Sequence, residues 1–236
     1  MNPLYMALDV PTWKEARDFL DTNHLQQVPV KVGMELFYRE GVHVIEQLKE
    51  RGHAIFLDLK LHDIPTTVKR AMANLASLEV DIVNIHALGG SDMIARAKEG
   101  LISGSKMDRT KLIAVTVLTS MDEQTMNQDL HIDGGVTEQA VHLAKVAYEN
   151  GADGVVCSVQ EVEQMKANCG DDFLTVTPGI RLARSEKDDQ KRIATPSIAR
   201  SAGTDSMVVG RSITKAEEPF KAYQEVMKEW NNGASY

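Results

Sequence analysis

The sequence predicts a (β/α)8 barrel, or TIM barrel, formed by a single domain over residues 1–236. Short apolar runs alternate with amphipathic segments, and the runs are rich in Val, Ile and Leu, as in strands that are covered on both faces. The chain is also close in length to the roughly 250 residues of such barrels. A doubly wound sheet is the main alternative. The eight candidate strands are residues 4–8, 28–32, 54–57, 81–85, 111–117, 154–157, 173–176 and 206–209.

Local signals mark helix boundaries between these strands. Thr12 and Glu15 have the spacing of a capping box, which predicts a helix after the first strand with its apolar face toward the core. Pro65 stands where a helix begins after the third strand. Gly151 ends the helix before the sixth strand, and Ser158 starts a second capping box after it. No linker rich in Pro, Gly or Ser divides the chain.

Composition limits the function classes. The formal net charge of −8 and the pI of about 5.4 argue against a nucleic-acid surface, but they allow a local basic pocket for a phosphate. The two cysteines, Cys157 and Cys169, form no CxxC pair, as expected in a reducing compartment. The sequence shows no signal-peptide pattern and no apolar run of membrane-spanning length. We therefore expect a cytoplasmic protein.

Charged residues cluster where three successive strands end. Asp9 follows the first run, Lys31 lies within the second, and Asp58 and Lys60 follow the third, with Asp63 three residues further on. In a barrel, the carboxyl ends of the strands form the active-site face. Burying charges is costly unless they are paired, so the cluster indicates either a catalytic group or a structural ion-pair network.

The end of the chain has the features of a phosphate site. Gly210 and Arg211 follow the eighth strand, where glycine permits close backbone approach and the last helix begins with free N–H groups. Arg181 follows the seventh strand. The polar stretch 182–195 is long for a strand-to-helix loop, and it is either a lid over the substrate or a solvated surface loop.

Other polar residues face the same end of the predicted barrel. His62 and His86 lie near strand ends, but no ligand cluster of familiar spacing accompanies them, so we expect hydrogen bonding and no metal site. Thr119 follows the fifth strand and either reads the edge of a heterocycle or caps a turn.

The chain resembles the orotidine 5′-phosphate decarboxylase family over its full length, and it is similar to the short bacterial members. The most specific match is the block 58–65, Asp-Leu-Lys-Leu-His-Asp-Ile-Pro. The Gly-Arg turn after the eighth strand would be weak evidence by itself. The full set of matching segments is 8–10, 30–33, 58–68, 115–120, 177–181 and 209–213.

The resemblance implies a role for each matching residue. Lys60 would donate a proton to C6 of the pyrimidine of orotidine 5′-monophosphate (OMP), and Asp58 would sit beside the substrate carboxylate and Lys60. Lys31 would pair within the network and contact the ribose, and Asp9 would bind a ribose hydroxyl. The remaining substrate-binding positions are Thr119 at the base, Pro178, and Arg181, Gln190, Gly210 and Arg211 at the phosphate end and its closing loop.

The resemblance also implies a homodimer without a metal or organic cofactor. Asp63, Ile64 and Thr67 would reach into the site of the neighbouring subunit. Loss of CO2 would leave a carbanion at C6, and a lysine between two carboxylates stays protonated at neutral pH and is suited to stabilise that charge. Two unit charges ~4 Å apart interact by ~4 kcal/mol at an effective dielectric of ~20.

Two other functions are compatible with parts of the pattern. A metal-dependent sugar-phosphate lyase or decarboxylase of the same superfamily shares the Asp-x-Lys-x-x-Asp spacing, but it carries an acidic ligand where this chain has Lys31. A non-catalytic barrel that binds a phosphate ligand would have little use for Lys60 with two acids.

Overall fold

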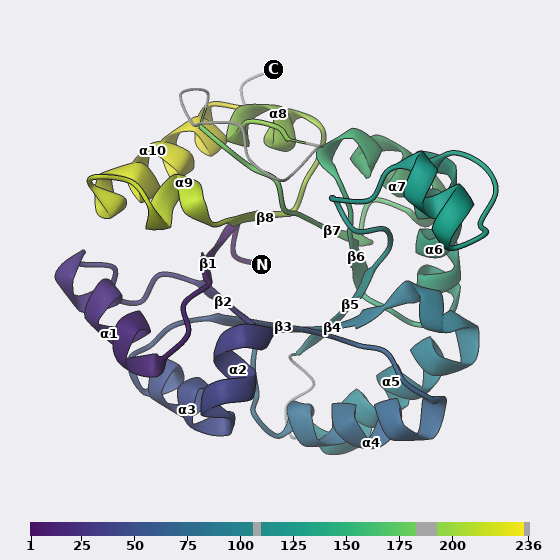
Figure 1. The fold of residues 1–236 in the computed structure, drawn as a ribbon, viewed down its shortest axis with the longest axis horizontal. Coiled ribbons are helices and arrows are strands. Elements are labelled where there is room, and N and C mark those ends of the chain that lie inside the picture. Colours follow the sequence, from purple (N-terminus) through teal and green to yellow (C-terminus); the bar gives the residue numbers. More distant parts are fainter. Residues whose placement is uncertain (106–109, 183–192, 234–236) are drawn as a thin grey trace.

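Eight parallel strands close into a barrel, and the helices lie around its outside (Figure 1). The computed structural model describes residues 1–105, 110–182 and 193–233. Each strand pairs with the next along the chain, and β8 pairs with β1, which confirms the predicted fold class. The strands are β1 (Leu4–Leu8), β2 (Val30–Gly33), β3 (Ile55–Leu61), β4 (Ile82–His86), β5 (Lys111–Val115), β6 (Gly154–Val156), β7 (Leu174–Thr177) and β8 (Ser206–Val209).

Three strands differ from their predicted bounds by more than one residue. β2 begins at Val30 and not at residue 28, because Pro29 has no N–H to donate to a ladder. β3 continues through the charged residues to Leu61, where the prediction ended it at residue 57. β5 ends at Val115, two residues early, and Thr116 donates both its N–H and its hydroxyl to the carbonyl oxygen of Val156.

The helices begin at several of the predicted signals. Pro65 is the first residue of its helix, and Ser158 and Glu161 form the reciprocal capping box. Thr12 Oγ1 accepts the N–H of Glu15 at 3.2 Å, but the Glu15 carboxylate bonds the Thr12 hydroxyl, so only half of that box forms. The helices are α1 (Trp13–Thr22), α2 (Met34–Glu40), α3 (Val42–Glu50), α4 (Pro65–Ala76), η1 (Ala87–Gly89), α5 (Gly90–Gly104), η2 (Thr125–Asp129), α6 (Val136–Glu149), η3 (Val159–Glu161), α7 (Val162–Cys169), α8 (Pro196–Ser201), α9 (Arg211–Thr214) and α10 (Pro219–Asn232).

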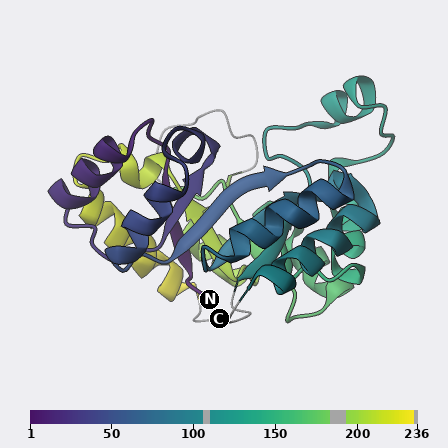
Figure 2. The ribbon, with the colours of Figure 1, turned by 90° about the horizontal axis from the view of Figure 1, so that it is seen from below.

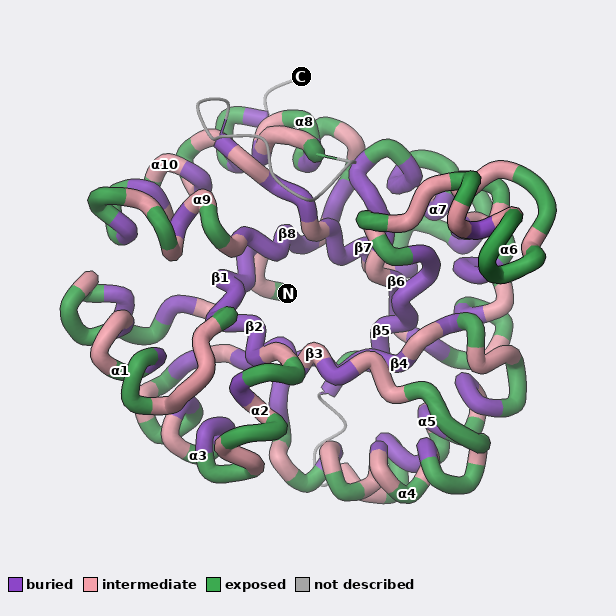
Figure 3. Tube along the Cα trace, viewed as in Figure 1, coloured by how far each residue is buried: buried purple, intermediate pink, exposed green. Residues whose placement is uncertain are grey.

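The strands are buried and the outer surfaces of the helices face solvent (Figure 3). One apolar cluster fills the space between strands and helices, and a second fills the inside of the barrel. In the second cluster, the rings of Tyr5 and Phe56 pack edge to face with their centroids 6.0 Å apart. This packing closes the barrel interior, so a ligand is confined to one end. Among the described residues, none of the helices has the length and apolar character to cross a membrane.

The two ends of the barrel are different. In the side view, the N-terminus lies at the lower end, whereas β3 points toward the upper end (Figure 2). The segment that contains η2 extends above that upper end. The strand-to-helix loops therefore build one crowded face at the carboxyl ends of the strands, which is the face that carries active sites in this fold.

Candidate active site

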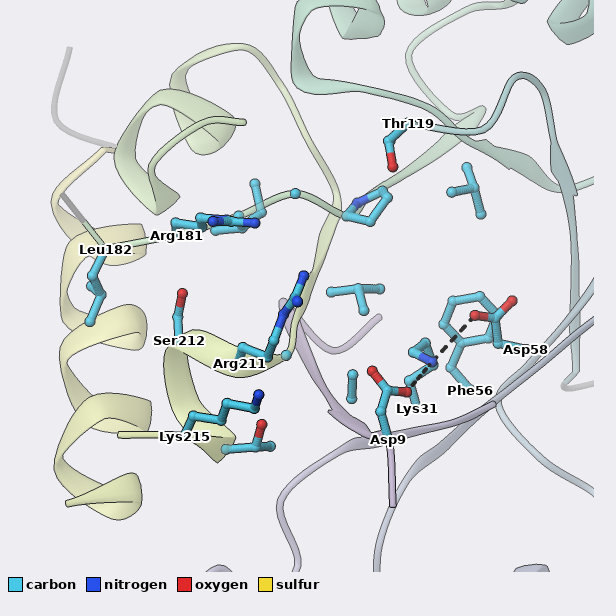
Figure 4. A pocket seen from close by; sticks show the side chains of 18 of the residues that line it. Asp9, Lys31, Phe56, Asp58, Thr119, Arg181, Leu182, Arg211, Ser212 and Lys215 are labelled. Carbon is cyan, nitrogen blue, oxygen red and sulfur yellow. Dashed lines mark hydrogen bonds and ion pairs between the residues drawn. The ribbon is translucent and has the colours of Figure 1, made fainter. Parts of the chain in front are cut away.

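A cavity of about 1160 Å³ opens at the carboxyl ends of the strands. Its lining includes apolar residues of the barrel interior, such as Phe56 and Val208. Figure 4 shows the acidic and basic residues of β1 to β3 on one side and the arginines after β7 and β8 on the other. The predicted site residues that line this cavity are Asp9, Lys31, Asp58, Lys60, Thr119, Pro178, Arg181, Gly210 and Arg211.

Four charged side chains, three in β2 and β3 and one directly after β1, form an ion-pair chain. Lys31 Nζ lies 3.1 Å from Asp9 Oδ1 and 3.4 Å from Asp58 Oδ2. Lys60 Nζ lies 2.6 Å from the other oxygen of Asp58. The side chains of Lys31 and Asp58 are only 11% and 13% exposed, so their charges interact with little screening by water. The alternating charges offset the cost of burying Lys31 and Asp58, whereas the side chain of Asp9 is 63% exposed.

Asp58 is the centre of this ion-pair chain. Burial by itself would raise the pKa of its carboxyl, but the charges of Lys31 and Lys60 and the hydrogen bonds that Asp58 accepts outweigh burial, and its pKa lies below the ordinary value. Asp58 is therefore ionised at neutral pH. Because its pKa is lowered by folding, its contribution to stability is complete above the unfolded-state pKa and is lost as the pH falls through the folded-state pKa.

A local irregularity of β3 places Lys60. The pairing of β3 with β4 shifts in register between Leu57 and Leu61, as at a β-bulge. Lys60 has a φ angle of +49°, a left-handed conformation that is unfavourable for a residue with a long side chain. Lys60 Nζ bonds Asp58, two residues earlier in the same strand.

Asn84 on β4 joins the same cluster and was not predicted. It is 1% exposed; its Nδ2 donates to Asp58 Oδ1 at 2.6 Å, and its Oδ1 accepts the backbone N–H of Lys60 at 2.7 Å. The signal was present in the sequence, because an amide inside the apolar run 81–85 is as unusual as the lysine inside the run 28–32.

Cationic side chains gather on the opposite side of the cavity. Arg181 and Arg211 line it, and Lys215, which was not predicted, lies one helical turn after Arg211 (Figure 4). A Cβ atom at Gly210 would lie 3.6 Å from the Cβ of Ala7, an ordinary contact, so the glycine is not required by the protein's own packing. Its effect is to leave the cavity wall open at this point.

At the phosphate end of the cavity, one expectation is contradicted and another is not tested. The prediction that the last helix begins after Gly210 is wrong, because α9 has only four residues and α10 begins at Pro219, whose fixed φ suits the first position of a new helix. Gln190 and most of the predicted lid lie outside the described residues.

The three residues expected to serve a neighbouring subunit do not line the cavity. Asp63, Ile64 and Thr67 are exposed, and 68% of the surface of Ile64 is accessible. Asp63 Oδ1 accepts the N–H of Ile64 at 2.6 Å. Within the described part of the chain, no ion pair joins Asp63 to Lys60.

His62 and His86 stack with their ring centroids 5.6 Å apart and an interplanar angle of 19°. Burial, followed by the charges of His62 and Lys60, lowers the pKa of His86. Its Nδ1 accepts the N–H of Leu88 at 3.3 Å, in agreement with the expected hydrogen-bonding role. Over the described residues, no three His, Cys, Asp or Glu side chains form a cluster suited to a metal ion.

Comparison with known proteins agrees with this geometry. Residues 2–226 match the family described as "Orotidine 5′-phosphate decarboxylase / HUMPS family". Orotidine 5′-phosphate decarboxylase of Bacillus cytotoxicus is 54% identical over 229 residues, which are 96% of each chain, and that of Bacillus pumilus is 53% identical over 95% of this chain and 97% of its own. The crystal structure of orotidine 5′-phosphate decarboxylase from Lactobacillus acidophilus superposes with a TM-score of 0.86 and 42% identity over 98% of this chain and 100% of that chain. The chain therefore belongs to the orotidine 5′-phosphate decarboxylase / HUMPS family.

Proposed function

We propose that the protein removes CO2 from OMP and produces uridine 5′-monophosphate (UMP), a step of de novo pyrimidine biosynthesis. Relatives with more than half of their residues identical carry the name of this activity. The observation that carries the proposal is the distribution of charge in one cavity. The ion-pair chain lies on one side and two arginines lie on the other, which fits a substrate with a reacting carboxylate at one end and a phosphate at the other.

The reaction is assigned to Lys60 and Asp58. Loss of CO2 leaves an electron pair at C6 in the plane of the ring, and the ring does not delocalise it. The ammonium of Lys60 stabilises that charge and then transfers a proton to C6. Asp58, whose carboxylate lies 2.6 Å from Nζ, fixes the position of the ammonium before the substrate reacts. The difference in stabilisation between the bound OMP and the carbanion is what accelerates the step.

The remaining cavity residues are assigned to binding. Lys31 and Asp9, which pair at 3.1 Å, bind the ribose hydroxyls. Thr119, whose hydroxyl points into the cavity in Figure 4, and Pro178 contact the base. The phosphate is assigned to Arg181, Arg211 and the backbone at Gly210, together with Gln190, which lies outside the described residues.

The proposed chemistry uses neither a metal nor an organic cofactor. A metal-dependent relative would carry an acidic ligand near the end of the second strand, where Lys31 supplies a positive charge that opposes binding of a second cation. In an absorbance assay with OMP, we therefore expect turnover that is undiminished after exhaustive chelation. Turnover that disappears on chelation and returns with added divalent metal would favour the metal-dependent alternative, and binding without turnover would favour a non-catalytic barrel.

We further propose that the active unit is a homodimer in which Asp63, Ile64 and Thr67 complete the partner's site. Asp63 has no ion pair with Lys60 of its own chain within the described residues, and Ile64 is an exposed apolar side chain. Leu88 after β4 is 39% exposed, so apolar surface follows two adjacent strands. Such surface is typical of an interface.

Mixing two inactive variants tests the shared site. Lys60→Ala and Asp63→Ala chains should each have little activity, and a mixed dimer should contain one site in which both residues are intact. We expect activity to recover to about one quarter of the normal value per chain after random exchange, since half of the dimers are mixed and each has one intact site. Each variant incubated alone is the control. Absence of recovery, with subunit exchange demonstrated independently, would contradict a role of Asp63 across the interface.

The proposed location is the cytoplasm. Both cysteines are free and buried, which fits a reducing compartment.

A further inference from the structure

The bulge in β3 leaves a gap in the strand ladder that a side chain fills. Leu57 pairs with Val83 and Leu61 pairs with Ile85, so three residues of β3 stand opposite the single residue Asn84. Where two strands lose register, backbone N–H and C=O groups lose their ladder partners and need others. The N–H of Lys60 is one such group, and it donates to Asn84 Oδ1 at 2.7 Å.

Both the oxygen and the nitrogen of the Asn84 amide form hydrogen bonds with residues of the ion-pair chain. Its Oδ1 holds the backbone of Lys60, and its Nδ2 donates at 2.6 Å to Asp58 Oδ1, the same oxygen that binds Lys60 Nζ. A primary amide is able to do this because it carries an acceptor and a donor on one planar group. An aliphatic residue would supply neither, and a carboxylate would supply only acceptors.

We propose that Asn84 is a positioning residue for the reaction, which sets the backbone conformation of Lys60 and the orientation of the Asp58 carboxylate. This inference rests on the proposed function. The left-handed backbone of Lys60, with a φ of +49°, persists only where its surroundings hold it, and Asn84 is the side chain that bonds its N–H. Without the amide, Lys60 has access to more favourable backbone angles, and Nζ moves relative to C6 of the substrate.

Because of where Asn84 lies, we expect its loss to affect the chemical step and not the binding of the substrate. Asn84 does not line the cavity, and within the described residues its side-chain hydrogen bonds go to Asp58 and to the backbone of Lys60, not to the residues assigned to the ribose and phosphate. A displacement of about 1 Å at a reacting group is enough to cost about 100-fold in rate. We therefore expect loss of Asn84 to lower kcat, while the binding of the phosphate and ribose remains near normal.

The test compares Asn84→Leu with the unaltered chain by steady-state decarboxylation of OMP and by calorimetric titration with UMP. We expect kcat to fall by about 100-fold, while KM and the Kd for UMP each change by less than about threefold, because Asn84 is not assigned a contact with the substrate. A kcat within about threefold of normal in a folded variant would overturn the proposal, as would equal losses in kcat and UMP affinity.

Two further variants keep the test decisive. If Asn84→Leu does not fold, Asn84→Asp keeps the shape and the acceptor for the Lys60 N–H but replaces the donor to Asp58 with a second carboxylate. At mildly alkaline pH, where a proton shared between the two acids is least favoured, we expect kcat to fall in this variant too, and normal kcat would overturn the proposal. Thr175→Val is the matched control, because it removes another buried strand hydrogen bond, 2.9 Å to Asp205, and should lower stability without lowering kcat.

Failure of this inference is distinguishable from failure of the proposed function. If the unaltered chain does not decarboxylate OMP, the proposed function is wrong. If it does and the Asn84 variants retain kcat, the function stands and only the positioning role of Asn84 is wrong.

Discussion

Replacing Lys60 with alanine is expected to lower kcat for OMP decarboxylation by about 10⁴-fold or more. Two contributions are lost together. Proton donation by a positioned side chain is worth about 10²–10⁴-fold, and electrostatic stabilisation of a developing charge is worth about 10²–10³-fold. Lys60 makes both in the proposed mechanism, since its ammonium is held 2.6 Å from Asp58 at the cavity wall. The measurement is the initial rate of the absorbance change with saturating OMP.

The variant should remain folded. Asp58 keeps Lys31 at 3.4 Å and the amide of Asn84 at 2.6 Å, so removal of Lys60 does not leave the carboxylate without partners. Titration with UMP checks that the cavity is intact. Lys166→Ala is the matched control, because Lys166 is also a partly buried lysine paired with an aspartate, at 2.7 Å from Asp205, and should leave kcat unchanged. Retention of more than a tenth of normal kcat by Lys60→Ala would remove Lys60 from its proposed role.

The barrel was predictable because its determinants are local. A strand that is covered on both faces must be apolar throughout, so each strand is visible as a short run of Val, Ile and Leu. The carboxyl ends of such strands meet at one face of the barrel. Charged residues in or directly after the carboxyl-terminal parts of successive strands, such as Asp9, Lys31 and Asp58, are therefore neighbours in space even though the chain separates them by more than twenty residues.

The bulge was not predictable, because register belongs to a pair of strands and not to either one. Period-two alternation placed Asp58 and Lys60 on one side of a regular strand. They do meet, but through an irregular strand in which Lys60 has left-handed backbone angles. The partner that accommodates this irregularity, Asn84, lies in another strand, and nothing in the sequence around residue 60 points to it. The helix predicted after Gly210 does begin there, but the prediction missed that it ends at Thr214 and that a separate helix begins at Pro219.

The second large effect that we expect is a loss of kcat/KM for OMP when Arg211, which is assigned to the phosphate, is replaced with alanine. The phosphate is remote from C6, yet binding energy gained there is available to hold the base and carboxylate against Lys60 and Asp58. Loss of a charged partner from a phosphate contact costs about 2–5 kcal/mol, which is about 30-fold to 5000-fold. Arg211→Ala should therefore lower kcat/KM for OMP by about 10²–10³-fold, toward the middle of that range.

Orotidine, the substrate without its phosphate, makes the test specific. The unaltered chain should turn over orotidine with a kcat/KM far below that for OMP, because both arginines of the phosphate end are then unused. Arg211→Ala should not lower the kcat/KM for orotidine further, since the interaction that it removes is absent with this substrate. Arg200→Ala, which changes an exposed arginine stacked 5.2 Å from the ring of Trp230, is the control and should turn over both substrates normally.

The two substrates and two chains form a cycle that isolates the contact. If Arg211 acts through the phosphate, the substitution costs about 10²–10³-fold with OMP and nothing with orotidine, and the coupling equals the whole effect. If the substitution instead disturbs the cavity, both substrates lose the same factor and the coupling is zero. Equal kcat/KM for OMP and orotidine in the unaltered chain would contradict the assignment of this end of the cavity to the phosphate. It would leave the chemistry at Lys60 untouched, because the ion-pair chain and the arginines lie on opposite sides of the cavity (Figure 4).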